Sequence, residues 1–148
     1  MTVPTLLPML ATASPPFDSP DYRFEIKWDG VRTLAAVDHA GWRLWGRHAA
    51  DYSARYPELA VLQHLPAGTL LDGELVVRGP ARPTLAALLR RHHLTDPWQI
   101  RLAQQWCPVR LVLFDLLYDR GGCLLTEPFR VRRQRLSDLA AAWPSSAL

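Results

Sequence analysis

The stretch that most constrains this chain is residues 22–32, which read Tyr-Arg-Phe-Glu-Ile-Lys-Trp-Asp-Gly-Val-Arg. Apolar and charged residues alternate at its start, and this is the period of a half-buried β-strand. The pattern predicts a strand over 22–28 with Lys27 on its polar face. Asp29 and Gly30 then predict a tight turn, because glycine tolerates positive φ, and a second apolar run follows.

Lys27 is also singled out by composition. The 17 basic residues include only one lysine, and all the others are arginines. An amine can lose its proton and act as a nucleophile, whereas a guanidinium stays protonated. The sequence therefore makes Lys27 a candidate nucleophile. Codon bias and chance would produce the same count, so composition alone does not decide.

Length and composition set the class of protein. A chain of 148 residues can form one domain with a real core, and 49% hydrophobic with 21% charged residues is typical of globular proteins. No apolar run is long enough for a transmembrane helix, and the first basic residue is Arg23, so neither such a helix nor a signal peptide is expected and the expected location is cytoplasmic. The net charge is +3, and the second half is the more basic. A polyanion such as DNA would suit that half, although exposed arginines also serve solubility.

The rest of the chain is expected to alternate strands and helices. A proline-rich leader over 1–21 should run extended and pack on the domain, since its five prolines exclude a long helix. Strands are expected over 31–37, 42–47, 69–77 and 109–118; helices are expected over 51–65, 84–91, 96–105 and 128–143, with a loop over 78–83. Arg90 and Arg91 could face DNA or lie at a solvated helix end.

One strand contains an unusual insertion. Asp72, Gly73 and Glu74 interrupt the apolar run over 69–77, although acidic residues and glycine are depleted in strand interiors. Such a conflict with local preference is typical of functional positions.

These motifs together resemble a known family. Glu25-Ile26-Lys27-Trp28-Asp29-Gly30-Val31-Arg32 is similar to the Glu-x-Lys-x-Asp-Gly-x-Arg signature of ATP-dependent DNA ligases, within the covalent nucleotidyltransferase superfamily. The shorter Lys-x-Asp-Gly also occurs in mRNA capping enzymes and RNA ligases. Further ligase-like motifs follow in the family's order: Arg55-Tyr56-Pro57-Glu58-Leu59, Asp72-Gly73-Glu74 and Phe114-Asp115-Leu116-Leu117-Tyr118. The leader segment Leu7-Pro8-Met9-Leu10-Ala11-Thr12 resembles bacterial end-joining ligases of the D type in particular.

The resemblance implies a role for each of six residues. Lys27 would be the catalytic residue that forms lysyl-AMP, and partial burial beside Trp28 would favour its neutral amine. The nucleotide would be bound by Glu25, Arg32, Arg47, Glu74 and Phe114. In this scheme Glu25 reads the adenine amine, the two arginines contact phosphate, Glu74 accepts from a ribose hydroxyl and Phe114 stacks on adenine. At position 47, an ordinary exposed arginine at a strand end would look the same. ATP and Mg²⁺ are the implied cofactors, and the metal ligands are not identified.

The implied fold class is α+β, with antiparallel sheets and packed helices in an ATP-grasp-like nucleotidyltransferase (DNA ligase adenylation) fold. The leader, 1–21, would precede a partial adenylation domain over 22–148, C-terminally incomplete because the family's later Glu-Gly and Lys-x-Lys motifs and its OB-fold domain are absent.

The implied function is DNA joining in repair and recombination, as a truncated ligase or one part of a split enzyme. Partners would be nicked or broken double-stranded DNA, a C-terminal ligase fragment with an OB-fold, and an end-binding repair protein at the bacterial nucleoid. Two alternatives stay open: an inactive nucleotide- or DNA-binding remnant, and a related capping-enzyme or RNA-ligase nucleotidyltransferase.

Overall fold

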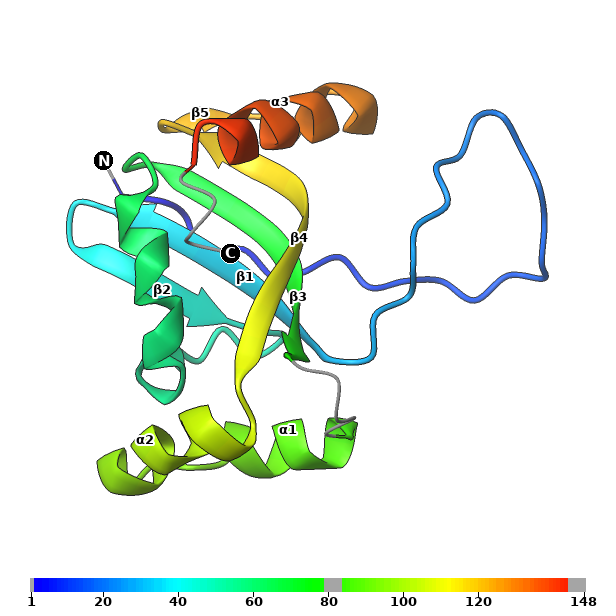
Figure 1. Ribbon diagram of the computed structural model, residues 1–148. Coiled ribbons are helices and arrows are strands. Elements are labelled where there is room, and N and C mark those ends of the chain that lie inside the picture. Colours follow the sequence, from blue (N-terminus) through cyan, green and yellow to red (C-terminus); the bar gives the residue numbers. More distant parts are fainter. Residues whose placement is uncertain (1, 79–83, 144–148) are drawn as a thin grey trace.

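The computed structural model describes residues 2–78 and 84–143, and it contains one five-stranded antiparallel sheet with the order β2-β1-β3-β4-β5 (Figure 1). The strands are β1 Val31–Asp38, β2 Gly41–Trp45, β3 Thr69–Val77, β4 Val109–Asp119 and β5 Gly122–Cys123. The helices are α1 Leu85–His92, α2 Pro97–Trp106 and α3 Phe129–Ala141, with 3-10 helices η1 Ser53–Arg55 and η2 Pro57–His64. The mixed sheet-and-helix class and most expected elements are thereby confirmed.

The two faces of the sheet carry different side chains. Along β1, Ala35 and Val37 belong to the main core, in which leucines of η2, α1 and α3 pack on the sheet. Leu34 and Ala36 point to the opposite face and form a smaller cluster with Trp45. Because side chains alternate along a strand, this second face continues toward the start of β1, where the candidate nucleotide residues lie.

An ion pair on the second face ties β1 to β3. The Arg32 Nε and Nη2 atoms donate to the two carboxylate oxygens of Asp72 at 2.6 and 2.7 Å. Burial raises the pKa of Asp72, and the hydrogen bond and charge of Arg32 oppose that rise. A buried carboxylate destabilises the folded state unless a cation compensates its charge. Because Asp72 is buried, the fold needs Arg32 as its partner.

A β-bulge in β4 completes this arrangement. Asp72 pairs with Asp115 whereas Gly73 pairs with Leu113, so Phe114 is the extra residue between two register positions. Bulges re-aim side chains, and here the Phe114 ring lies under the Arg32 guanidinium, 4.4 Å from its centroid. The bulge thus brings Phe114 onto the face that carries the ion pair.

The strand expected over 22–28 is wrong. The structure has no regular secondary structure there, and Phe24 and Ile26 are exposed. A strand needs a neighbour to satisfy its backbone groups, and both edges of β1 are already occupied, by β2 and β3. The segment therefore cannot join the sheet beside β1, and it does not pair with the outer edge of β4 either, where β5 occupies only Tyr118 and Asp119.

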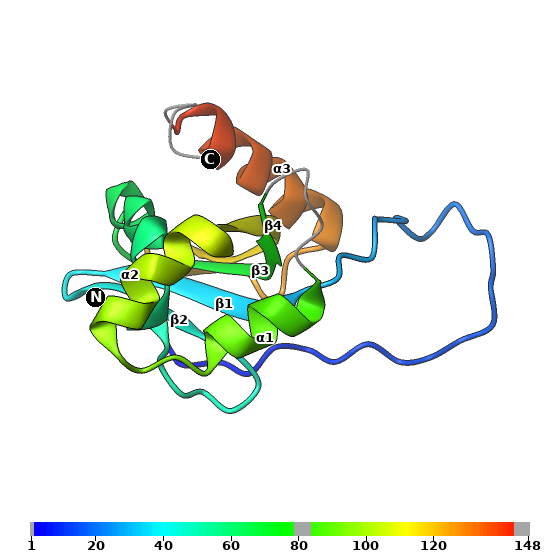
Figure 2. The ribbon, with the colours of Figure 1, turned by 60° about the horizontal axis from the view of Figure 1, so that its bottom comes forward.

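The leader packs on the sheet only at its beginning. Val3 is buried, and the carbonyl of Leu6 accepts a hydrogen bond from Trp45 Nε1 at 2.7 Å. Met9 and the residues up to Phe17 are exposed, and the chain makes a wide excursion before it returns to β1 (Figures 1 and 2).

Two further expectations need correction. The helix expected over 51–65, with an interruption at Pro57, is indeed interrupted there, but its two parts are the 3-10 helices η1 and η2, separated at Tyr56. Arg91 neither faces DNA nor lies at a solvated helix end: its side chain is fully buried and donates to Glu58 at 2.7 Å. The loop expected over 78–83 lies outside the described residues except for Arg78. Among the described residues, no helix is long and apolar enough to cross a membrane.

Removing Arg32 should destabilise the fold in a pH-dependent way. Arg32→Ala leaves the Asp72 carboxylate unpaired, and we expect a loss of about 2 to 4 kcal/mol, below the range for fully buried pairs since Arg32 is 32% exposed. Without Arg32, burial raises the pKa of Asp72 further, because only the backbone hydrogen bond from Gly73 still opposes the rise. A carboxyl group whose pKa is higher in the folded state than in the unfolded state binds more protons when folded. The free energy of unfolding therefore falls as pH rises. The loss in urea unfolding should therefore be smaller at pH 5 than at pH 8.

The exposed pair Arg120–Asp119 provides the control for that experiment. Arg120 is 66% exposed in its side chain, so Arg120→Ala should change stability by less than about 1 kcal/mol at either pH. Equal losses for the two variants would contradict a supporting role for the Arg32–Asp72 pair.

Gly73 should be intolerant of even one added carbon. A Cβ at Gly73 would lie 2.5 Å from the carbonyl oxygen of Val112, so β3 and β4 would have to separate. We expect Gly73→Ala to cost about 1 to 3 kcal/mol by chemical denaturation. Gly122→Ala, at the exposed β5, is the matched control and should cost clearly less; a Gly73→Ala variant as stable as this control would rule out the close approach.

Candidate functional site

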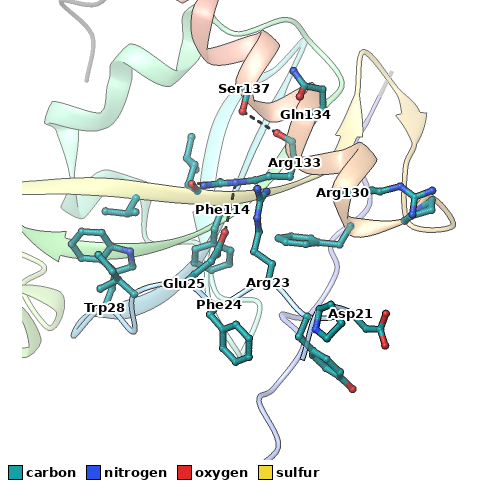
Figure 3. Close-up of a pocket in the computed structure, with 17 residues that line it drawn as sticks. Asp21, Arg23, Phe24, Glu25, Trp28, Phe114, Arg130, Arg133, Gln134 and Ser137 are labelled. Carbon is teal, nitrogen blue, oxygen red and sulfur yellow. Dashed lines mark hydrogen bonds and ion pairs between the residues drawn. The ribbon is translucent and has the colours of Figure 1, made fainter. Parts of the chain in front are cut away.

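A pocket of about 1370 Å³ lies between the 20–28 segment, β4 and α3 (Figure 3). The 20–28 segment contributes eight charged, aromatic or apolar residues to the lining, and α3 contributes mostly polar ones. The residues central to the following description are Arg23, Glu25, Trp28, Phe114, Arg130 and Arg133. The irregular segment that replaces the expected strand thus forms one wall of the pocket.

Two of the predicted nucleotide residues meet in this pocket. Phe114 presents its ring from the β4 bulge, and Glu25 reaches in from the opposite wall. Glu25 forms an ion pair with Arg133 of α3, with 3.6 Å between Oε1 and Nε (Figure 3). An aromatic ring beside a carboxylate can bind a flat base through stacking and through an exocyclic N–H donor.

The remaining predicted residues do not line this pocket, and they lie around Glu74 of β3. Glu74 of β3 lies opposite Arg32 of β1 in the register of the two strands. Burial raises the pKa of Glu74, while the charges of Arg32, Lys27 and Arg47 oppose the rise. The structure therefore brings the three cations close enough to act on one carboxylate, although they come from three separate parts of the chain. Arg32 already binds Asp72, so its guanidinium is only partly free for a phosphate.

The local surroundings of Lys27 differ from expectation. The prediction of partial burial is wrong, because Lys27 is exposed. Its neighbours Ile26 and Trp28 line the pocket, but Lys27 does not. The physical reason is the missing strand, since without a sheet partner the segment buries few of its side chains.

Gly30 holds the motif against the sheet. A Cβ there would lie 2.2 Å from the carbonyl oxygen of Leu75 and 2.9 Å from Glu74 Cγ. Its φ is not in the left-handed region, so the expected reason for this glycine, a positive φ, is wrong. Glycine is required by close approach, and this approach sets the position of Lys27 relative to Glu74.

The metal site is not provided by these side chains. Among the described residues, no three His, Cys, Asp or Glu side chains are grouped as metal ligands. Asp72 is also occupied by Arg32. The donor set of the described residues therefore does not fit a resident metal ion, and the chemistry of the site has to be derived from its own side chains.

The sequence did not identify the arginines that line the pocket. Arg23 precedes Glu25 on the 20–28 segment, and Arg130 and Arg133 are three residues apart on α3. That spacing places two residues on the same side of a helix. The arginine-rich sequence of α3 was the available signal, but several of its arginines serve other contacts; Arg132, for example, binds Asp115.

Comparison with known proteins places the chain among the ligases. Residues 8–146 match the family model described as ATP dependent DNA ligase domain. The chain is 34% identical to DNA ligase C1 of Mycolicibacterium smegmatis over 143 residues, covering 91% of this chain and 41% of that protein. It is 35% identical to the multifunctional non-homologous end joining DNA repair protein LigD of Mycobacterium tuberculosis, covering 93% of this chain and 17% of that protein.

Solved structures agree with this result. The ligase domain of M. tuberculosis LigD, and a mycobacterial DNA ligase D complexed with ATP and MES, each superpose with a TM-score of 0.58 at 33% identity. The match covers 80% of this chain and 36% of each of those chains. This chain thus spans less than half the length of the relatives it matches. On the family match and these identities, the chain belongs to the ATP-dependent DNA ligase domain family.

Proposed function

We propose that this chain is the nucleotide-binding part of a DNA ligase adenylation domain, in which Lys27 accepts AMP from ATP. The observation that supports this most directly is the meeting of Glu25 and Phe114 in one pocket, with Lys27 and Glu74 beside it. Each of these residues lies in a motif of the ligase family, and the folded chain gathers them from three segments.

The proposed nucleotide contacts combine the roles implied by the ligase motifs with the positions of these residues. Adenine stacks on Phe114, which is worth about 1 to 3 kcal/mol, and its exocyclic amine donates to Glu25. Glu74 accepts a hydrogen bond from a ribose hydroxyl. Arg47 is exposed and Arg32 is about one-third exposed, so both can approach the phosphates of a bound nucleotide.

Lys27 carries the proposed chemistry. Its neutral amine attacks the α-phosphorus of ATP, a P–N bond forms, the bond to the bridging oxygen breaks, and pyrophosphate leaves with that oxygen. The amine proton passes to solvent, because Lys27 is exposed. In-line transfer needs a positioned nucleophile and neutralised phosphate oxygens, and we assign these roles to Lys27 and to the nearby arginines. Mg²⁺ bound to ATP would supply neutralisation of the pyrophosphate.

The wider function is proposed by analogy with the relatives. AMP would pass from Lys27 to a 5′-phosphate in double-stranded DNA, and a 3′-hydroxyl would then displace it to seal the break. Relatives named for non-homologous end joining suggest repair in the bacterial cytoplasm, with an end-binding protein and a ligase fragment that carries an OB-fold as partners. We assign residues 1–21 as the leader and 22–148 as part of the adenylation domain, of the ATP-grasp-like nucleotidyltransferase type.

One observation favours a second candidate function. Lys27 does not line the pocket that contains Glu25 and Phe114. A domain that binds ATP or DNA without transferring AMP would have this geometry. The two functions differ in one measurable product, the covalent adenylyl group on lysine.

Nucleotide binding should depend on Glu74. Glu74→Ala removes a hydrogen-bond acceptor in a partly buried site, and we expect roughly 5- to 150-fold weaker ATP binding by calorimetry. Asp18→Ala removes an exposed carboxylate from the leader and should leave the affinity unchanged. Unchanged affinity in the Glu74 variant would contradict the ribose contact, and tighter binding of GTP than of ATP would contradict the adenine assignment.

Adenylyl transfer should require the amine of Lys27. Lys27→Arg keeps the charge and loses the nucleophile, so it should abolish the adduct while ATP affinity stays within about two-fold. The measurement is intact mass after incubation with ATP and Mg²⁺, alone and with the remainder of a LigD ligase domain supplied in trans. Because Lys27 is the only lysine, a single acid-labile adenylyl group on the unmodified sequence identifies its site.

Two outcomes would change this assignment. An adduct on the Lys27→Arg variant would show that another residue carries AMP. No adduct on the original sequence, even with the remainder of a ligase domain present, together with normal ATP binding, would establish the second candidate function.

A further inference from the structure

Arg133 connects the two walls of the pocket. Its Nη1 donates to the carbonyl oxygen of Leu113 at 3.2 Å, directly before the bulged residue Phe114. Its Nε lies 3.6 Å from Glu25 Oε1, on the opposite wall. In Figure 3 its side chain crosses the pocket above Phe114 toward Glu25. One guanidinium therefore links the residue beside the stacking ring to the carboxylate that faces it.

The Glu25 wall has few other restraints. Residues 22–28 form no strand, and Glu25 is exposed. Trp28 adds one contact at the end of the segment, since Arg110 lies 5.5 Å from its ring centroid. A carboxylate on an irregular segment loses much of its orientation unless a fixed partner holds it, and α3 supplies that partner.

We propose that Arg133 is a positioning residue for base selection: it holds Glu25 Oε1, leaving Oε2 to accept the exocyclic amine of adenine. This rests on the proposed function of the site. The planar fork of arginine can serve two acceptors at once, so the same side chain sets the spacing between the carboxylate and the Phe114 ring. That spacing must allow a base to stack on the Phe114 ring and, at the same time, to donate a hydrogen bond to the Glu25 carboxylate.

The inference predicts a loss that is specific to the amine. ITP has a carbonyl oxygen where ATP has the amine, so the ratio of ATP to ITP affinity reports the contact with Glu25. Arg133→Gln should weaken ATP binding about three- to ten-fold and leave ITP binding nearly unchanged, so the ratio falls toward one. Arg133→Lys keeps the charge without the fork and should recover only part of the ratio.

Other arginines of α3 serve as controls, because they distinguish a specific effect on the amine contact from a general attraction between positive charge and phosphate. Arg130 lines the same pocket but extends away from Glu25 in Figure 3, so Arg130→Gln should affect ATP and ITP equally. Arg135 is exposed outside the pocket, and Arg135→Gln should affect neither. In a Glu25→Gln background, Arg133→Gln should have no further effect on the ratio, since the group it positions is gone.

The possible outcomes distinguish the inference from the proposed function. An original chain that prefers ATP over ITP, with a ratio unchanged in both the Gln and the Lys variants of Arg133, overturns the inference and leaves the proposed function intact. The same holds for equal weakening of both nucleotides. A chain that binds neither nucleotide overturns both. Melting curves for each variant confirm that the compared proteins are folded.

Discussion

The pairing of Arg32 with Asp72 is the constraint on which the candidate site depends. A carboxylate in the middle of β3 is unfavourable unless a cation compensates it, and Arg32 on the neighbouring strand does so through two short hydrogen bonds. The guanidinium also covers the Phe114 ring, so three strands are joined at one point. The site is therefore built into the sheet.

The opposite side of the pocket is held quite differently. The 20–28 segment has no strand neighbour, and it is fixed by a few specific contacts: the close approach of Gly30 to β3, the stacking of Arg110 on Trp28, and the ion pair between Arg133 and Glu25. In the proposed function, the wall built into the sheet stacks the base and the more weakly restrained wall selects it. Such a combination allows the second wall to adjust around a nucleotide while the first stays in place.

This division bears on the proposed chemistry. Lys27 lies on the weakly restrained wall, exposed and outside the set of residues that line the pocket, although its charge acts on Glu74. Transfer of AMP requires the amine within bonding reach of the α-phosphorus. In the proposed mechanism, the nucleotide bridges the two walls and brings Lys27 toward the sheet, so positioning of the segment and positioning of the nucleophile are the same event.

From local pattern and the order of motifs, the sequence alone predicted the strands β1, β2, β3 and β4, the helices α1, α2 and α3, the family, and Lys27 as the candidate nucleophile. It could not determine which alternating segment finds a partner, because hydrogen bonding between strands depends on neighbours distant in the chain. The 22–28 segment alternates like a strand but pairs with none, and it cannot join the sheet beside β1 because β2 and β3 already flank that strand. For the same reason, only the tertiary structure showed that Arg91 is buried beside Glu58 and that Arg133 reaches Glu25: the partners lie far apart in the sequence, and long-range packing alone brings them together.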